Sequence, residues 1–247
     1  MGQLEGKTAI VTGASDGIGL GAATRLAQEG AHVFITGRRT EQLEAAARAI
    51  GSATAIPGDV SNLADLDRLY DAVRDRGQGL DVVFANAGAA GFATLEETTE
   101  EHLDHIYRVN IRGTVFTVQK ALPLLNEGAS IILNLSTRAD DGWAGFGAYG
   151  ASKAALRLYT RTWANELKGR GIRVNAVSPG AIETPAVAKM VGEADAEAVK
   201  ATFRASVPLG RHGTIEEVAA AVAFLASDQS SFVLGTSLYV DGGESQL

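Results

Sequence analysis

The sequence predicts one α/β domain built on a doubly wound parallel sheet. Short runs that are apolar on both faces alternate with amphipathic stretches along the whole chain. Strands buried on both faces are typical of a parallel sheet covered by helices on both sides, and right-handed crossovers then wind that sheet in two directions. The chain has 247 residues, of which 46% are apolar, so a single domain, 1–247, can bury a large core.

Seven apolar runs are expected to form strands, because each is short and rich in apolar or β-branched residues. In chain order they cover residues 8–12, 32–36, 53–57, 80–85, 130–135, 173–177 and 237–240. Amphipathic stretches predict helices over residues 17–29, 41–50, 63–74, 100–124, 149–168 and 216–226, and Gly30 ends the first of them. Residues 183–211 break the alternation, and we expect them to form a mobile flap over a site.

Composition argues against several classes of function. The formal net charge is −7, whereas a nucleic-acid-binding protein usually presents a basic face, so we expect no nucleic-acid partner. The chain has no cysteine and four scattered histidines, and we expect no metal site. The first residues lack the apolar core of a signal peptide, and no apolar run reaches the roughly 18 residues that span a bilayer. We therefore expect a cytoplasmic protein with no membrane partner.

A glycine-rich segment with the pattern G-x-x-x-G-x-G follows the first predicted strand and opens the first predicted helix. Gly13 permits a tight turn, Gly17 lets a pyrophosphate approach closely, and Gly19 lets the helix pack on the strand. The positive end of the helix then points at the anion. The segment predicts a dinucleotide-binding loop whose candidate contacts are Gly13, Ser15, Asp16, Gly17, Ile18 and Gly19.

The tip of the second predicted strand indicates which cofactor is preferred. NAD-binding proteins carry an acidic residue there that holds the ribose 2′-hydroxyl, whereas this chain has Gly37, Arg38 and Arg39. A guanidinium group binds phosphate through two parallel hydrogen bonds. The tip therefore predicts NADP(H), with Arg38 as the main contact, and leaves NAD(H) as the weaker alternative because Asp16 opposes a 2′-phosphate.

Three polar residues suggest carbonyl chemistry. Tyr149 and Lys153 share one face of a predicted helix, and Ser136 ends the fifth predicted strand on the ligand side of the sheet. A carbonyl reductase needs a hydride donor, a proton donor and a hydrogen bond to the carbonyl. Tyrosine, with a pKa of about 10, is a poor acid–base group near neutrality, but a nearby ammonium lowers that pKa. The trio predicts interconversion of a ketone or aldehyde with an alcohol.

With these motifs the chain resembles a standard-length member of the short-chain dehydrogenase/reductase family. The matching pieces are T-G-A-S-D-G-I-G from Thr12, N-A-G from Asn86, Asn110, Ser136, Tyr149, Lys153, S-P-G-A-I-E-T from Ser178 and D-G-G from Asp241. The resemblance extends over nearly the whole chain. It implies a Rossmann fold, an NAD(P)(H)-dependent oxidoreductase with a small-molecule carbonyl or alcohol substrate, and a homotetramer in which the long helices pair.

The resemblance also implies roles for individual residues. Tyr149 would be the general acid/base, Ser136 would hold the carbonyl, and Lys153 would bind the nicotinamide ribose and tune Tyr149. Asn110 would place a water that connects Lys153 to solvent. Further cofactor contacts would be Asp59 and Val60 at the adenine, Asn86, Ala87 and Gly88 beneath the cofactor, and Pro179, Gly180, Ile182 and Thr184 around the carboxamide.

The substrate side departs from the family pattern, because residues 136–141 are charged where relatives have small residues. The candidate substrate contacts are Phe92, Arg138, Trp143, Phe146 and Met190. Two alternatives remain open: an NAD-dependent alcohol dehydrogenase of the same family and a non-catalytic dinucleotide sensor. An intact acid–base set argues against the sensor, which has no need of one.

Overall fold

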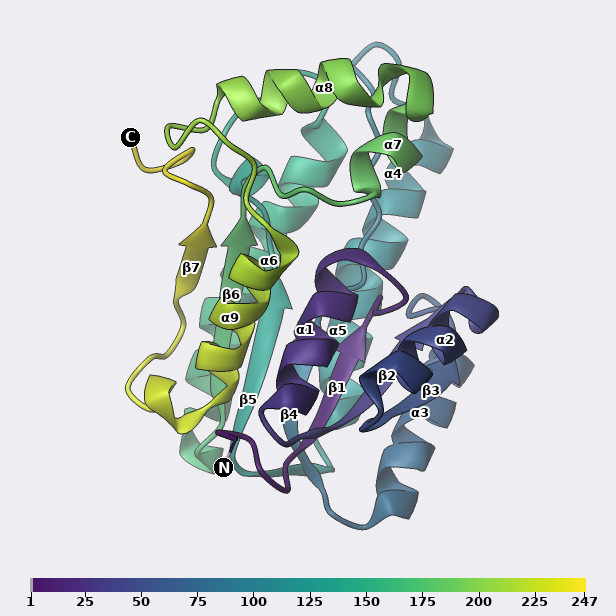
Figure 1. Ribbon diagram of the computed structural model, residues 1–247, viewed down its shortest axis with the longest axis vertical. Helices are drawn as coiled ribbons and strands as arrows, with labels where there is room; N and C mark the ends of the chain where they lie inside the picture. The colour runs from purple at the N-terminus through teal and green to yellow at the C-terminus, as the bar shows by residue number, and fades with distance from the viewer. Residues whose placement is uncertain (1) are drawn as a thin grey trace.

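In the computed structural model, which describes residues 2–247, seven strands form one sheet whose neighbouring pairs are all parallel (Figure 1). Their order across the sheet is β3-β2-β1-β4-β5-β6-β7. The strands are β1 (Thr8–Thr12), β2 (His32–Gly37), β3 (Ala53–Pro57), β4 (Leu80–Ala85), β5 (Leu125–Asn134), β6 (Arg173–Pro179) and β7 (Ser237–Val240). The predicted doubly wound α/β fold is confirmed. The strand order reverses between β1 and β4, and α/β sheets bind ligands at the carboxyl ends beside such a point.

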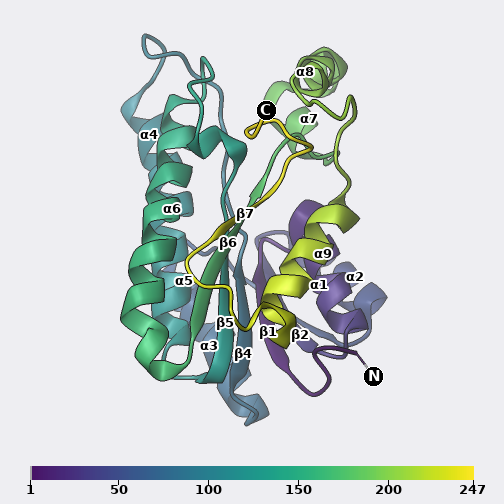
Figure 2. The same ribbon diagram turned by 90° about the vertical axis from the view of Figure 1, so that its left-hand side faces the viewer.

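Helices cover both faces of the sheet (Figure 2). One face carries α1 (Gly17–Gln28), α2 (Thr40–Ile50) and α9 (Ile215–Ala226). The opposite face carries α3 (Leu63–Arg76), α5 (Thr114–Ala121) and α6 (Gly147–Leu167). Leu26 and Val222 are buried on the first face, and Leu69 and Leu156 on the second, which leaves the central strands without solvent contact. No helix within residues 2–247 is both long and apolar enough to cross a membrane.

The long helix predicted over residues 100–124 differs from that prediction in two ways. It begins as α4 (Glu100–Tyr107), widens into a π-helical segment (Arg108–Gly113), and continues as α5. It ends at Ala121 rather than 124, because Pro123 has no N–H to donate to the preceding turn. A widened turn inside a helix is often found at functional sites, and this one carries Asn110.

The fifth strand starts earlier than predicted, at Leu125 rather than 130. Leu125 pairs with Leu80, and the register then shifts before Ser130 pairs with Val82. The intervening Glu127 and Gly128 are polar or small and exposed, so no apolar pattern indicates a strand there. Short single turns follow other elements, at η2 (Thr137–Ala139), η3 (Lys168–Arg170) and η4 (Asp228–Ser230).

The segment predicted as a flap folds into α7 (Ala186–Val191) and α8 (Glu193–Ala205), which lie across the carboxyl ends of the strands (Figures 1 and 2). Gly192 joins the two helices with φ +86°, a conformation that favours glycine. The flap therefore covers the end of the sheet where ligands are expected, and its mobility stays a prediction.

Candidate active site

The glycine-rich loop is bound tightly to the segment that follows β4. Thr12 Oγ1 accepts hydrogen bonds from the backbone amides of Asn86 and Ala87, both at 3.0 Å. The Asn86 side-chain amide donates to the carbonyls of Thr12 and Gly13, at 2.9 and 3.2 Å. A Cβ atom on Gly13 would lie 2.9 Å from the Cα atom of Ala87, so only glycine allows this approach. The loop is thereby held in place before α1 begins at Gly17.

This loop borders a cavity of about 520 Å³, the dinucleotide cleft, at the carboxyl ends of β1, β2 and β4. The predicted contacts that line it are Gly13, Ser15, Asp16, Gly17, Ile18, Gly19, Gly37, Arg38, Arg39, Asp59, Val60, Asn86, Ala87, Gly88 and Thr184. The sequence missed Val109 and Lys189, which also line it. Backbone-rich glycine turns, basic groups and apolar walls fit a nicotinamide dinucleotide.

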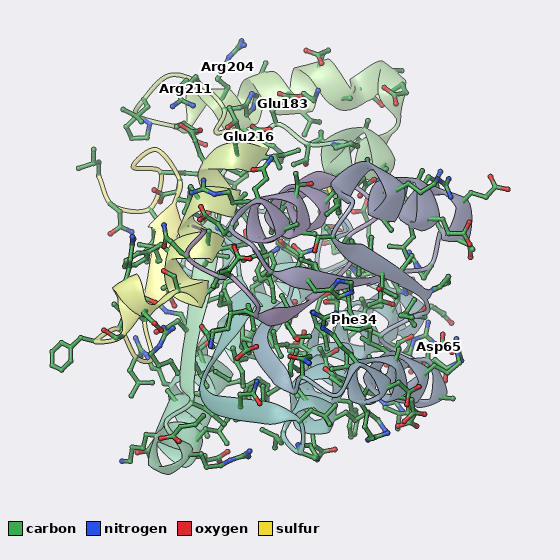
Figure 3. The ribbon with its side chains drawn as sticks, turned by 60° about the horizontal axis from the view of Figure 1, so that its bottom comes forward. Phe34, Asp65, Glu183, Arg204, Arg211 and Glu216 are labelled. Carbon is green, nitrogen blue, oxygen red and sulfur yellow. The ribbon has the colours of Figure 1, made fainter. Side chains whose placement is uncertain are left out.

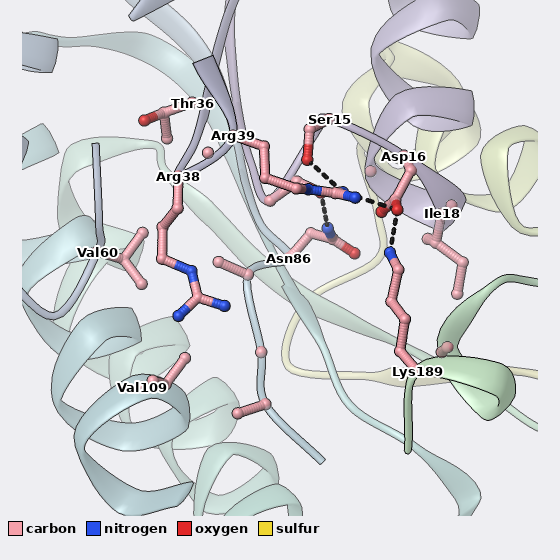
Figure 4. A pocket seen from close by; sticks show the side chains of 18 of the residues that line it. Ser15, Asp16, Ile18, Thr36, Arg38, Arg39, Val60, Asn86, Val109 and Lys189 are labelled. Carbon is pink, nitrogen blue, oxygen red and sulfur yellow. Dashed lines mark hydrogen bonds and ion pairs between the residues drawn. The ribbon is translucent and has the colours of Figure 1, made fainter. Parts of the chain in front are cut away.

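The two arginines at the tip of β2 point in different directions (Figure 4). Arg38 extends along the cleft toward Val60 and Val109. Arg39 turns toward the glycine-rich loop, where its Nη2 donates to Ser15 Oγ and pairs with Asp16 Oδ2, each at 2.7 Å. Both side chains line the same cleft and approach it from different sides of the tip of β2.

Asp16 was expected to oppose a 2′-phosphate, but its charge is compensated in the structure. Lys189 from α7 pairs with the same Asp16 Oδ2 that accepts from Arg39. Partial burial raises the pKa of Asp16, but the hydrogen bonds and charges of Lys189 and Arg39 outweigh burial and lower it overall. The carboxylate is therefore ionised and held between two cations.

Ser136 and Tyr149 line a second cavity of about 200 Å³, the substrate cavity. Lys153 is buried behind its wall, where its Nζ donates to the Asn134 carbonyl at 2.7 Å and lies 5.6 Å from the centroid of the Tyr149 ring. Ser136 lies two residues after the end of β5, and Tyr149 and Lys153 lie on the first two turns of α6. The fold therefore brings the predicted trio together.

Asn110 is buried in the π-helical segment and braces the chain after β4. Its side-chain nitrogen donates to the Ala89 carbonyl at 3.0 Å and to Ser152 Oγ at 2.9 Å, while its oxygen accepts from the Ala89 amide at 2.7 Å. A Cβ atom on Gly88 would lie 3.5 Å from Asn110 Oδ1 and 3.6 Å from Lys153 Nζ. Asn110 is thus beside Lys153, and its part in a proton relay stays a prediction.

The acid–base groups are perturbed in opposite directions by burial. Burial raises the pKa of Tyr149, while a hydrogen bond with Ser136 and the charge of Arg138 lower it without cancelling the increase. Burial lowers the pKa of Lys153 to about 8. The sequence predicts that the Lys153 ammonium lowers the tyrosine pKa, whereas in the structure desolvation of Tyr149 outweighs the lowering by Ser136 and Arg138.

The dinucleotide cleft and the substrate cavity meet. Ile18, Ala90, Thr184 and Ala186 line both of them. The remaining residues predicted around the carboxamide, Pro179, Gly180 and Ile182, line the substrate cavity. A ligand in the cleft can therefore reach the space in front of Ser136 and Tyr149.

The structure brings some of the predicted substrate contacts to the substrate cavity and leaves others outside it. Arg138, Phe146 and Met190 line the substrate cavity, but Phe92 and Trp143 do not. Phe92 is 56% exposed and packs its ring against the edge of Phe146, at 5.8 Å between centroids. Trp143 stacks on Arg138, whose guanidinium carbon lies 4.1 Å from the ring centroid. Both aromatic rings therefore contact residues of the cavity wall without lining the cavity themselves.

A buried charge cluster beside this cavity includes a residue that the sequence did not indicate. Arg138 pairs with Glu244 and with Asp141, the second at 3.1 Å. Glu244 also accepts from Ser206 Oγ at 2.9 Å and from Thr137 Oγ1 at 3.2 Å. Glu244 follows β7, so the end of the chain forms part of the cavity wall together with the turn after β5 and the end of the flap.

Residues 13–245 match the family described as Enoyl-(Acyl carrier protein) reductase. The chain is 46% identical over 248 residues to Oxidoreductase asL5 of Sarocladium schorii, covering 99% of this chain and 98% of that protein.

Two solved structures share both the fold and more than a third of the sequence. One is a short chain dehydrogenase from Burkholderia cenocepacia J2315 in complex with NADP, with 35% identity, a TM-score of 0.89, and coverage of 98% of this chain and 99% of that one. The other is 3-ketoacyl-(acyl-carrier-protein) reductase from Brucella melitensis complexed with NADH, with 35% identity, a TM-score of 0.91 and the same coverage.

Proposed function

Because this chain is an oxidoreductase that belongs to the short-chain dehydrogenase/reductase family, we propose that it interconverts a ketone or aldehyde with an alcohol and prefers NADP(H). One observation carries the proposal. Ser136 and Tyr149 line a cavity that opens into the cleft beside the glycine-rich loop. A carbonyl held by these two hydroxyls would therefore lie next to a dinucleotide in the cleft.

The roles of the side chains follow from this arrangement. A nicotinamide cofactor, when bound, supplies the hydride. The Ser136 hydroxyl donates a hydrogen bond to the carbonyl oxygen, which polarises the bond and fixes its orientation. Tyr149 donates its phenolic proton to the same oxygen as negative charge develops there. Proton transfer leaves a phenolate on Tyr149. Lys153 is buried next to the tyrosine ring, and its ammonium form stabilises that phenolate.

The preference for NADP(H) is supported by the tip of β2. Arg38 and Arg39 both line the cleft, and no carboxylate stands at the tip to hold a ribose 2′-hydroxyl. The similar proteins do not decide the preference, since one is in complex with NADP and another with NADH. Arg39 and Lys189 compensate the charge of Asp16, so Asp16 weakens a phosphate site at this position without abolishing it.

The test is a spectrophotometric assay of the purified protein with NADPH and a panel of ketones and aldehydes. We expect loss of absorbance at the reduced nicotinamide band with at least one carbonyl, and slower loss with NADH at equal concentration. A protein that binds NADPH, seen as a change in nicotinamide fluorescence, yet oxidises it with no member of a broad panel would instead be a dinucleotide sensor. Faster turnover with NADH would contradict the cofactor preference.

We also propose a homotetramer, from the family resemblance and the outer surface of α6. Leu158 on this helix is 65% exposed, and the small side chains of Ala151 and Ala154 are exposed as well. Such a face allows close helix packing between subunits. Sedimentation at micromolar concentration should show a tetramer, and a single monomeric species would contradict the assembly.

A further inference from the structure

Lys189 connects the flap to the dinucleotide cleft. It lies on α7, 173 residues after Asp16 in the sequence, and pairs with the Oδ2 atom of that carboxylate (Figure 4). The same oxygen receives Arg39 from the tip of β2. One carboxylate oxygen thus joins the glycine-rich loop, the second strand and the flap.

The lining of the cleft carries more positive than negative charge. Its cations are Arg38, Arg39 and Lys189, and its carboxylates are Asp16 and Asp59. This excess occurs in a chain whose formal net charge is −7, so it is a local feature. The Arg39 and Lys189 side chains are 41% and 51% exposed, and exposed ion pairs of this kind exchange partners at little cost.

Arg39 and Lys189 meet beside the tip of β2, where a 2′-phosphate would bind. The tip of β2 is the position at which dinucleotide-binding folds contact the ribose 2′ oxygen. Ser15 Oγ accepts a hydrogen bond from Arg39 at 2.7 Å. It also lies next to Gly37 at the tip of β2, since a Cβ atom built on Gly37 would be 3.5 Å from it. A phosphate seated there lies within the group formed by Ser15, Arg39 and the ammonium of Lys189.

The same short helix also contacts the substrate cavity. Lys189 lines the dinucleotide cleft, and its neighbour Met190 lines the substrate cavity. Phe203 on α8 lines that cavity too. A contact between Lys189 and the cofactor would therefore set the position of the residues that enclose the substrate.

We propose that Lys189 is a specificity residue for the 2′-phosphate of NADP(H), carried on the flap and held by Asp16 until a phosphate takes its place. The proposal rests on the function proposed above. It adds that phosphate recognition includes the flap, and that Asp16 competes with the phosphate for Lys189 and Arg39. Removal of Lys189 and neutralisation of Asp16 should consequently have opposite effects on NADP⁺ binding.

Isothermal titration calorimetry of the full chain with NADP⁺ and NAD⁺ tests this without any turnover. Lys189→Met should weaken NADP⁺ binding about three- to tenfold, as expected for a partly exposed charge-assisted contact, and leave the Kd for NAD⁺ within about twofold. Asp16→Asn should tighten NADP⁺ binding by a similar factor. Added salt should shrink both effects, because the groups are exposed to solvent.

Arg204→Met is the matched control. Arg204 lies on α8 of the same flap, is exposed, and projects away from the rest of the molecule (Figure 3). This variant removes one positive charge from the flap without touching the cleft, so both Kd values should stay at wild-type levels. If Lys189→Met and Arg204→Met weaken NADP⁺ binding equally, the effect comes from the net charge of the flap and the proposal is overturned.

Other outcomes are equally decisive. If Lys189→Met weakens NADP⁺ and NAD⁺ alike, the contact is with a group that both cofactors share and the 2′-phosphate assignment is wrong. If Asp16→Asn weakens NADP⁺ binding, Asp16 does not compete with the phosphate. A wild-type chain that binds neither dinucleotide would refute the proposed function itself, whereas wild-type selectivity that Lys189→Met leaves unchanged refutes only the role of Lys189.

Hydrogen exchange of the flap gives a second readout. NADP⁺ should protect the backbone amides of α7 and α8 more than NAD⁺ does at equal saturation, because only NADP⁺ offers the extra phosphate to Lys189. In Lys189→Met this difference should disappear while Arg204→Met retains it. A difference that persists without Lys189 would show that another group couples the flap to the phosphate.

Discussion

The dinucleotide cleft and the wall of the substrate cavity each contain a cluster of ion pairs, but solvent reaches the two clusters very differently. In the cleft, the Asp16, Arg39 and Lys189 side chains are 36%, 41% and 51% exposed. Beside the substrate cavity, Arg138 and Glu244 are 9% and 5% exposed. An exposed pair contributes about 0–1 kcal/mol and can be exchanged for a ligand, whereas breaking a buried pair costs about 3–5 kcal/mol. The first cluster is therefore suited to recognition, and the second to holding the cavity wall.

The largest effect should come from a change that disables the substrate side and spares the cofactor side. Tyr149→Phe removes the proton donor but keeps the ring, so kcat should fall by about 10² to 10⁴. The Kd for NADP⁺, measured by calorimetry, should stay within about twofold, because the cleft and its charges are unchanged. Turnover within about threefold of wild type would exclude Tyr149 as the acid.

A second test compares the two charge clusters directly through the free energy of unfolding in urea. Arg138→Met leaves Glu244 and Asp141 without their shared cation and should lower stability by about 3–5 kcal/mol. Arg39→Met breaks an exposed pair and should lower it by less than about 1 kcal/mol. Adding Glu244→Gln to Arg138→Met should restore part of the loss. Similar losses for both single variants would remove the distinction between the clusters.

The third test concerns recognition in the cleft. Arg38→Ala should raise the KM for NADPH about ten- to a hundredfold, as expected for loss of a charge-assisted phosphate contact, and should raise the KM for NADH far less. Added salt should imitate part of the loss in the wild-type enzyme. If Arg38→Ala leaves the ratio of the two KM values unchanged, recognition of the phosphate lies elsewhere in the cleft.

The last test concerns the buried ammonium of Lys153 and is made without cofactor. Burial lowers the Lys153 pKa to about 8. Below that pH Lys153 is charged in both states, but its charge is desolvated in the folded state and hydrated in the unfolded chain. Between about pH 8 and the ordinary lysine pKa of 10.5, folding releases this proton and stability of the wild type rises with pH.

Lys153→Met has no such titration. The free energy of unfolding of the variant minus that of the wild type should therefore be highest below pH 8. It should fall as the pH rises toward 10.5, because only the wild type gains stability there. Thermal unfolding of both proteins across this range measures the difference, and the loss of the hydrogen bond to Asn134 shifts it by a constant amount. A pH-independent difference would mean that Lys153 keeps its ordinary pKa in the fold.

The continuous motifs of the cleft could be predicted from the sequence far better than the long-range pairings of the two clusters, and chain separation explains why. The glycine-rich loop and the tip of β2 are short continuous motifs, each at the end of a strand whose apolar pattern is plain. Glu244 meets Arg138 from 106 residues away, and Lys189 meets Asp16 from 173 residues away. Such pairings depend on how helices and tails cross the finished sheet, and no local pattern encodes them.

The misplaced elements have local causes as well. The amphipathic pattern continued through the widened turn at Asn110, since a π-helical turn changes the hydrogen bonding more than the distribution of apolar residues. The sequence predicts that Phe92 and Trp143 line the substrate cavity, because aromatic residues close to the proposed acid–base tyrosine suggest an apolar wall. Their actual partners, Phe146 and Arg138, could be known only from the packing.

The stacking of Trp143 on Arg138 gives the protein an optical reporter of its candidate active site. The chain has two tryptophans, and the other, Trp163, stacks on Tyr159 within α6 at 4.8 Å between ring centroids. Trp143 also lies 5.4 Å from the Phe203 ring of the flap, so its emission depends on the arrangement of cavity wall and flap together. In a Trp163→Phe background, the intrinsic fluorescence of Trp143 would follow ligand entry in real time, with no attached dye.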